Sequence, residues 1–161
     1  MQFENFSINL VEKLKRIDIE INNEKIEQLY KYMNLLIEWN EKVNLTAIIE
    51  PDDIILKHFV DSLTVCKEIK GNIKVADIGT GAGFPGLPIK ILKPEIHMTL
   101  IDSLNKRIKF LDEVITKNNL INISTIHARA EEIGHNKNYR GMFDIVVSRA
   151  VAKLNVLVDK R

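Results

Sequence analysis

A glycine-rich bend between two apolar stretches constrains the fold of this chain most strongly. Residues 75–91 read VADIGTGAGFPGLPIKI, in which an apolar run leads into closely spaced glycines and prolines and a helical pattern follows. Glycine adopts positive φ and carries no Cβ, so spaced glycines let the backbone turn sharply and let another group approach it closely. The stretch therefore predicts a strand, a tight turn and a helix, with a ligand against the turn.

The sequence after residue 71 alternates short apolar runs with helical patterns. We predict strands at 73–78, 97–102, 123–127 and 143–148, helices at 85–93 and 104–118, and a short segment at 129–134 between the last two strands. This alternation is typical of a parallel sheet with right-handed crossovers and helices on its faces. We expect an α/β protein whose ligand lies at the carboxyl ends of the strands.

The first 70 residues show helical periodicity instead. A long helix is expected after Asn22 or Asn23 as its N-cap, and another is expected to begin at Pro51, where proline needs no backbone donor. The predicted buried face of that later helix consists of Leu56, Phe59, Val60 and Leu63. We therefore divide the chain into a helical N-terminal subdomain, 1–70, and a ligand-binding domain, 71–161.

Composition limits the class of protein. The 161 residues are 45% hydrophobic and 28% charged with a net charge of +1, which is close to average soluble usage. The apolar runs are shorter than the roughly 20 residues of a bilayer span, and the start lacks a signal-peptide layout, so we expect a cytoplasmic protein with no membrane partner. The lone Cys66 excludes a disulfide framework and a multi-cysteine metal site, and we predict no metal.

Two ligand classes fit the glycine turn. Gly81, Gly83 and Gly86 match the GxGxxG pattern of a dinucleotide site. Asp102, about 20 residues downstream, would then be the ribose acceptor. This match favours a nicotinamide-dependent oxidoreductase. However, Pro85 removes a backbone donor that pyrophosphate would need, and Asp77 adds a negative charge. A cationic nucleoside without phosphate, S-adenosyl-L-methionine, fits these residues better.

Several segments resemble one known family. They are DIGTGAGFPGLPIKI, LIDSLNKRIKFL, HARAEEI and FDIVVSRAVAKL, preceded by WNEKVNLTAI and HFVDSL. Together they resemble the RsmG family, also called glucose-inhibited division protein B, over about residues 20–158. Its members are bacterial methyltransferases that act on guanine N7 of 16S ribosomal RNA with S-adenosyl-L-methionine. The resemblance implies a Rossmann-like class I methyltransferase sheet and, as partner, 16S ribosomal RNA or the small ribosomal subunit.

The resemblance also implies cofactor contacts. They fall on Gly79, Phe84, Ala130, Glu131 and Arg149, to which the residue-level reasoning adds Asp77, Gly81, Gly83 and Asp102. Glu131 equally fits an acid at the start of a helix. Arg149 follows an apolar strand, so its charge must meet a ligand carboxylate, a nearby acid or an RNA phosphate.

Six basic residues are the candidates for RNA contact. They are Arg149, Lys106, Arg107, Arg129, Lys57 and His58. Lys106 and Arg107 equally fit a solvated helix face, and His58 and Asp61 equally fit an i,i+3 pair. We predict no catalytic base, because guanine N7 carries a lone pair and no proton; alignment and desolvation suffice for transfer.

Sequences of the resembled family continue beyond a segment like SRAVAKL. We therefore expect four strands here in the order 3-2-1-4, with the later strands absent and 143–148 forming an apolar edge unless another copy pairs there. An inactive cofactor-binding fragment of the methyltransferase stays open as a further alternative. The sequence does not indicate an oligomeric state.

Overall fold

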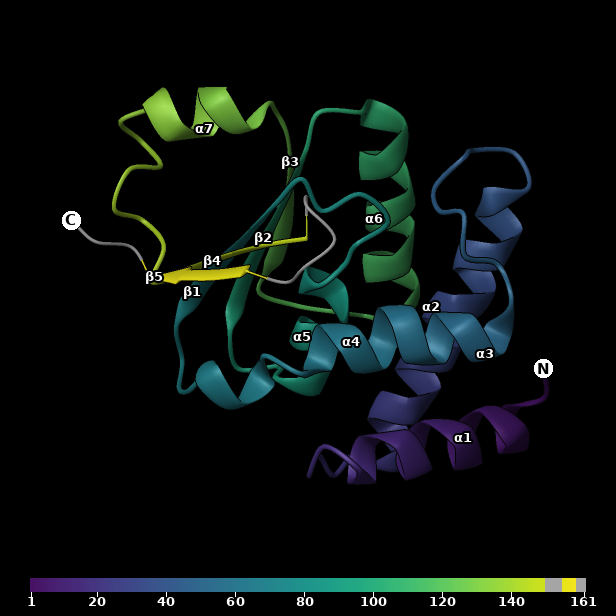
Figure 1. Cartoon of the computed structure of the whole chain (residues 1–161). Coiled ribbons are helices and arrows are strands. Elements are labelled where there is room, and N and C mark those ends of the chain that lie inside the picture. Colours follow the sequence, from purple (N-terminus) through teal and green to yellow (C-terminus); the bar gives the residue numbers. More distant parts are fainter. Residues whose placement is uncertain (150–154, 159–161) are drawn as a thin grey trace.

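A computed structural model describes residues 1–149 and 155–158, which form a sheet with helices on its faces (Figure 1). The strands run in the order β3-β2-β1-β4-β5 across the sheet. Their bounds are β1 Lys74–Ile78, β2 His97–Asp102, β3 Ile123–His127, β4 Ile145–Ser148 and β5 Asn155–Val158. The first four are parallel, so the predicted order 3-2-1-4 is confirmed.

The register of the parallel strands aligns the residues that end them. Ile78 of β1 pairs with Ile101 of β2, and Asp102 of β2 pairs with His127 of β3. The turns that follow these three strands therefore leave the sheet side by side.

The strand β5 differs from the expectation. It pairs antiparallel with β4, with Val146 opposite Leu157, so β4 is not an edge of the sheet. The prediction of an uncovered edge at 143–148 and of no later strand was wrong. A run as short as NVLV does not distinguish a strand from a buried helical turn by periodicity.

Two helical starts follow the predicted signals. The Asn22 side chain accepts a hydrogen bond from the Lys25 N–H at 3.0 Å and caps α2, while Pro51 lies in the first turn of α3. The helices are α1 Phe3–Lys15, α2 Asn23–Asn40, α3 Pro51–Asp53, η1 Ile54–Val60, α4 Asp61–Leu63, η2 Cys66–Glu68, α5 Gly86–Leu92, α6 Asn105–Lys117 and α7 Ala130–His135.

The segment η1 is π-helical, and it changes the buried face predicted for this helix. Leu56 is 47% exposed, whereas Ile55, Phe59 and Leu63 are fully buried. A π-helix has a wider turn than an α-helix, so the α-helical spacing used for the prediction assigns the wrong residue to the face.

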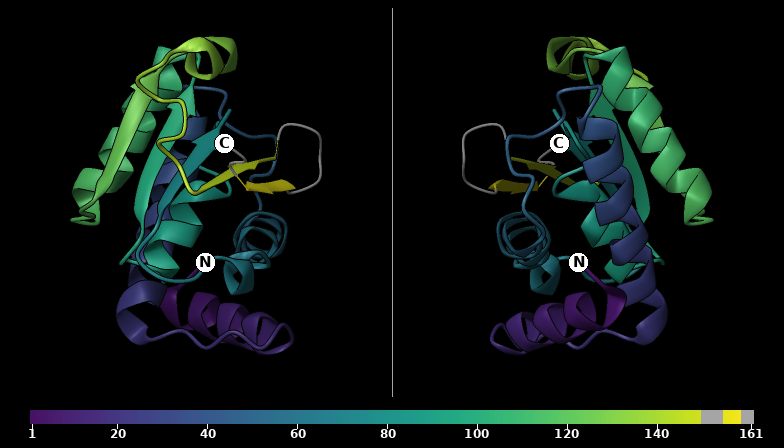
Figure 2. Two further views of the ribbon diagram at one scale, coloured as in Figure 1. Left: turned by 90° about the vertical axis from the view of Figure 1, so that its left-hand side faces the viewer. Right: turned by 90° about the vertical axis from the view of Figure 1, so that its right-hand side faces the viewer.

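The helices form layers on the sheet. Helices α5 and α6 pack against it, and α2 packs in turn against both of them. The main hydrophobic core draws on the N-terminal helices and the sheet together, for example Phe6, Val75 and Phe110, while a smaller cluster that includes Ala76 and Ile101 lies on the other face. Figure 2 shows α1 at the opposite end of the molecule from α7.

Candidate functional site

Two cavities meet at Gly79, where β1 ends. The larger, about 760 Å³, is lined by Gly79, Asp102, Ser103, Arg107, Ala128, Arg129, Ala130, Glu131 and Glu132. The smaller, about 210 Å³, is lined by Leu45, Thr46, His58, Gly79, Thr80, Ala82, Phe84 and Arg149. Both lie at the carboxyl ends of the strands, where the sheet argument expects a ligand.

The first two glycines of the turn have open space beside them. Gly79 and Gly81 have φ of +69° and +60°, and a Cβ added at either would meet no atom within 4 Å. The N–H groups of Gly79 and Thr80 both donate to the Ile101 carbonyl, at 2.9 and 3.0 Å, which ties the turn to β2. This part of the turn is open to a ligand, as the sequence predicts.

The later glycines serve packing. A Cβ at Gly83 would lie 2.5 Å from the Tyr32 hydroxyl oxygen and 2.6 Å from Leu87 Cδ1, and one at Gly86 would lie 2.5 Å from Leu100 Cδ2. The expected ligand contact at Gly83 is therefore not supported, because the missing side chain makes room for core side chains.

Asp77 lies beneath the turn and outside both cavities. Its side chain is completely buried, and Oδ2 accepts hydrogen bonds from Thr80 Oγ1 at 2.7 Å and the Gly86 N–H at 2.8 Å. Burial raises the pKa of this carboxyl to about 7, against the lowering effect of its hydrogen bonds and of Arg149. The prediction of a direct ligand contact by Asp77 does not agree with this position, since the residue instead holds the turn together.

Asp102 lines the larger cavity at the end of β2. Its Oδ2 accepts the Gly81 N–H at 2.8 Å, and Oδ1 accepts the Leu104 N–H at 3.0 Å and lies 3.5 Å from Arg107 Nη1. A carboxylate has about four acceptor positions, so Oδ2 keeps one for a hydroxyl group. This geometry suits the predicted ribose contact.

Ala130 and Glu131 begin α7 and are exposed on the wall of the larger cavity. The side chains of this wall that sequence reasoning missed are Ser103, Ala128 and Glu132. Each of the three follows directly after a predicted strand end or a predicted ligand residue. That position in the sequence is the signal that could have predicted them.

Phe84 lies in a stack of rings beside the smaller cavity. The His58 ring is parallel to it at 4.0 Å between centroids, and the Tyr32 ring stacks on it at 5.3 Å. The Tyr32 hydroxyl donates to the Ala82 carbonyl at 2.5 Å, so α2 supports the glycine turn directly. Only 5% of Phe84 is exposed, so the ring contributes to the wall of the cavity and has no open face on which a ligand could stack.

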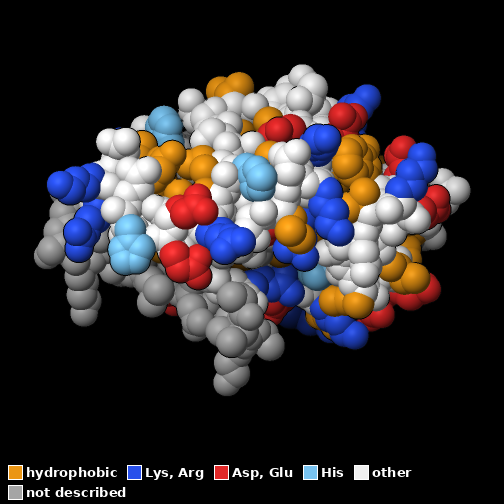
Figure 3. Space-filling view, turned by 90° about the horizontal axis from the view of Figure 1, so that it is seen from above, with side chains coloured by type: hydrophobic (Ala, Val, Ile, Leu, Met, Phe, Trp, Pro, Cys, Tyr) orange, Lys and Arg blue, Asp and Glu red, His pale blue; other side chains and the backbone are white. Residues whose placement is uncertain are grey.

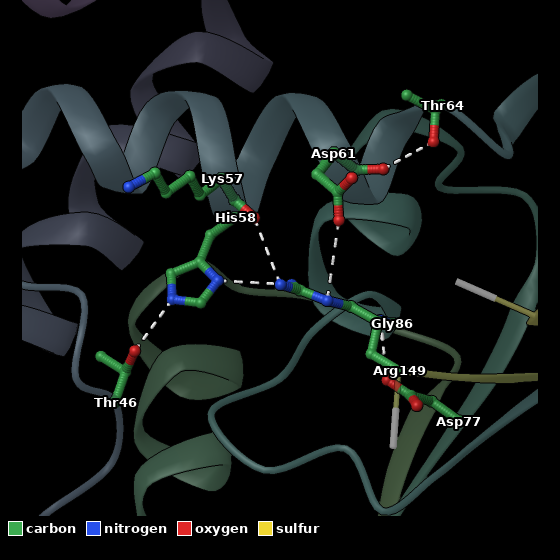
Figure 4. Close-up of polar contacts among 8 residues, drawn as sticks. All are labelled: Thr46, Lys57, His58, Asp61, Thr64, Asp77, Gly86 and Arg149. Atoms are coloured by element: carbon green, nitrogen blue, oxygen red, sulfur yellow. Dashed lines mark hydrogen bonds and ion pairs between the residues drawn. The ribbon is translucent and has the colours of Figure 1, made fainter. Parts of the chain in front are cut away.

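Arg149 joins the end of β4 to the η1–α4 helix (Figure 4). Its Nη2 donates to the Lys57 carbonyl at 3.2 Å, Nη1 lies 3.3 Å from His58 Nδ1, and Nε lies 3.7 Å from Asp61 Oδ2. The sequence left three partners open for this charge: a ligand carboxylate, a nearby acid or an RNA phosphate. The structure has a nearby acid, Asp61. His58 and Asp61 therefore share Arg149 and do not form the i,i+3 pair.

His58 is buried, with 7% of its surface exposed, and its Nε2 lies 2.9 Å from Thr46 Oγ1. Burial, together with the Arg149 charge, lowers the pKa of its imidazole to about 4. The prediction that His58 contacts RNA does not agree with this position, because the ring is covered and neutral.

The remaining RNA candidates divide into two groups. Lys106, Arg129 and Lys57 are exposed; Arg129 also lines the larger cavity, and Lys57 lies 3.6 Å from Asp53. Arg107 turns toward Asp102 inside the larger cavity, which corrects its placement on an RNA surface. Figure 3 shows the molecule from above, and on the face drawn there basic and acidic side chains are interspersed.

Among residues 1–149 and 155–158 there is no cluster of three or more His, Cys, Asp or Glu side chains that could hold a metal ion. In the same part of the chain, each helix is too short or too polar to cross a bilayer.

Comparison with known proteins identifies the family. The model of the GidB family, described as rRNA small subunit methyltransferase G, matches residues 25–160. The chain belongs to this family. The rRNA small subunit methyltransferase G of Desulforamulus reducens is 54% identical over 155 residues, 95% of this chain and 65% of its own length. That of Desulfitobacterium hafniense is 53% identical over 145 residues, 90% of this chain and 60% of its own length.

The chain thus spans slightly less than two thirds of these GidB-family relatives. Among solved structures, coclaurine N-methyltransferase bound to N-methylheliamine and SAH is similar with a TM-score of 0.51 and 14% identity. The match covers 91% of this chain and 50% of that one. At this identity it shows a shared fold, in agreement with the predicted class I methyltransferase sheet.

Proposed function

We propose that this chain binds S-adenosyl-L-methionine in the larger cavity and takes part in methylating N7 of a guanosine in 16S ribosomal RNA. The observation that carries the proposal is the open backbone of Gly79 at the junction of two cavities, with Asp102 on one side and Arg149 on the other. Membership of the rRNA small subunit methyltransferase G family supports the substrate class.

The residues present fit this cofactor. Gly79 and Gly81 leave space that side chains would fill, Asp102 keeps an acceptor for a ribose hydroxyl, and Glu131 supplies a second acid on the wall. Ala130 offers a small side chain that leaves room for a base. The Asp77 carboxyl stabilises the turn from below and keeps its glycines in place.

The same geometry disfavours a dinucleotide. Pyrophosphate binds the free N–H groups at the start of the first helix. Here the Gly86 N–H already donates to Asp77 Oδ2, and the Leu87 N–H donates to the Gly83 carbonyl at 2.7 Å. A second negative group at this point would face the buried Asp77, so we do not favour a nicotinamide-dependent oxidoreductase.

The proposed chemistry makes few demands on side chains. The bound cofactor would supply an activated methyl group, and guanine N7 accepts it through a lone pair with no proton to remove. The protein therefore needs to align the acceptor and exclude water. Both cavities adjoin Gly79, so an acceptor in the smaller one would lie next to a cofactor in the larger one.

Calorimetric titration tests cofactor binding. We expect saturable binding of S-adenosylhomocysteine and no response to NADH, and we expect Glu131→Gln to weaken the binding. Glu113→Gln, at a partly exposed acid of α6 that lines neither cavity, is the matched control and should bind like the unaltered chain. Binding of NADH without S-adenosylhomocysteine would refute the proposal.

Transfer is tested separately. Small ribosomal subunits that lack the modification are incubated with tritiated S-adenosyl-L-methionine, and the label is mapped on the RNA by mass analysis. Label on a guanine N7 supports the full proposal. Cofactor binding without label would support the inactive cofactor-binding fragment and limit the proposal to its first half.

A further inference from the structure

The polar contacts of the Arg149 guanidinium come from one helix. The Lys57 carbonyl, His58 Nδ1 and the Asp61 carboxylate all belong to the continuous stretch η1–α4 (Figure 4), while the Phe84 ring lies 5.6 Å from Arg149 Cζ. Arg149 itself follows β4, far away in the sequence. The N-terminal helices thus orient the guanidinium of Arg149, which follows β4 and lines the smaller cavity.

The hydrogen bonds define the state of His58. Arginine has only donors, so His58 Nδ1 must be the acceptor in the contact with Arg149 Nη1. The proton of the neutral ring then lies on Nε2 and is donated to Thr46 Oγ1, which also accepts the Ile48 N–H at 3.1 Å. The parallel Phe84 ring prevents rotation of the imidazole out of this plane.

These contacts leave part of the guanidinium available. Each terminal nitrogen uses one N–H on the η1 helix and keeps a second one that has no partner among the described residues. Arg149 lines the smaller cavity with 21% of its side chain exposed. These two N–H groups are the donors that Arg149 can offer to acceptor atoms of a nucleotide in the smaller cavity.

We propose that His58, neutral and protonated on Nε2, is a positioning residue that holds the Arg149 guanidinium beside the smaller cavity for the methyl-acceptor nucleotide. This inference rests on the proposed function. His58 acts through Arg149, because its ring is 7% exposed at the wall of the smaller cavity and both of its nitrogens already contact Thr46 and Arg149.

The tautomer is measured first, on the unaltered full chain. Long-range proton–nitrogen NMR of the ¹⁵N-labelled protein distinguishes the two ring nitrogens. We expect His58 to carry its proton on Nε2 throughout roughly pH 6 to 8, where an unperturbed histidine titrates. An Nδ1-protonated ring, or an imidazolium at neutral pH, would overturn the inference.

Substitutions then test the consequence. Binding of a 16S ribosomal RNA transcript is measured in saturating S-adenosylhomocysteine. We expect His58→Ala to weaken RNA binding about tenfold, as for the loss of a hydrogen bond to a charged group. His58→Asn keeps an acceptor near the Nδ1 position and should stay within about twofold of the unaltered chain. His97→Asn, at the amino end of β2, is the matched control and should change nothing.

A double substitution separates positioning from packing. Arg149→Ala combined with His58→Ala should bind RNA no more weakly than Arg149→Ala alone, because both act through one group. Additive losses, equal losses in His58→Asn and His58→Ala, or no RNA binding by the unaltered chain would overturn the inference. Failure to bind S-adenosylhomocysteine would instead refute the proposed function. If His58→Ala does not fold, the tautomer measurement still tests the contact with Arg149, and unchanged RNA binding by Arg149→Ala would overturn the inference.

Discussion

Replacing Gly83 with alanine should destabilise the chain more than replacing Gly79, although both glycines have positive φ. At Gly83, with φ of +102°, the new Cβ would lie 2.5 Å from the Tyr32 hydroxyl oxygen, 2.6 Å from Leu87 Cδ1 and 3.1 Å from Leu111 Cδ2. Left-handed backbone costs an alanine about 1–2 kcal/mol, and overpacking adds about 1–3 kcal/mol. We therefore expect Gly83→Ala to lower the free energy of unfolding by about 2–5 kcal/mol.

At Gly79 only the backbone strain applies, because nothing lies within 4 Å of the added Cβ. We expect Gly79→Ala to cost about 1–2 kcal/mol of stability and to weaken S-adenosylhomocysteine binding, since this position faces both cavities.

Urea unfolding followed by circular dichroism measures the stability, and calorimetric titration measures the affinity. Gly134→Ala is the control: it lies in α7 with open space around its Cβ and should change stability by no more than about 1 kcal/mol. Equal stability of Gly83→Ala and Gly79→Ala would refute the division of the glycines into packing and ligand positions.

Two further predictions concern buried titratable groups. Because the pKa of Asp77 is raised to about 7 in the fold, its contribution to stability is complete below its unfolded pKa and is lost as pH rises to about 7. The pKa of His58 is lowered to about 4, so its contribution is present above pH 6.5 and is lost as pH falls to about 4. Between about pH 4 and 6.5, Asp77 makes stability fall with rising pH and His58 makes it rise. Asp77→Asn should therefore leave a stability that rises with pH, and His58→Asn one that falls with pH. Parallel urea-midpoint curves for the two variants would contradict both assignments. Burial raises the pKa of the Cys66 thiol to about 12, so this thiol should react with a thiol reagent only when the chain is unfolded in urea. Absorbance of the released product measures the reaction. Rapid reaction of the folded chain would place this thiol at the surface.

Local signals in the sequence determined most of the elements and the general place of the site. The alternation of apolar runs and helical patterns predicts each of the four parallel strands, and Asn22 and Pro51 predict two helix starts that the structure contains. These signals work because they depend on residues a few positions apart: side-chain periodicity, a cap and a proline that needs no donor. The place where we expect a ligand follows from the parallel topology, which brings the carboxyl ends of the strands together, and the structure has two cavities there.

Tertiary structure alone decided what the individual side chains do. Asp77, near the end of β1, and Gly83, in the turn that follows, are close to Gly79 in the sequence, yet the fold directs the first two into the core and leaves the third open. His58 looks like an exposed basic residue until β4 brings Arg149 against it. Which way a side chain of a turn faces, and which distant charge it meets, depends on how separate elements pack, and that information is absent from spacing along the chain.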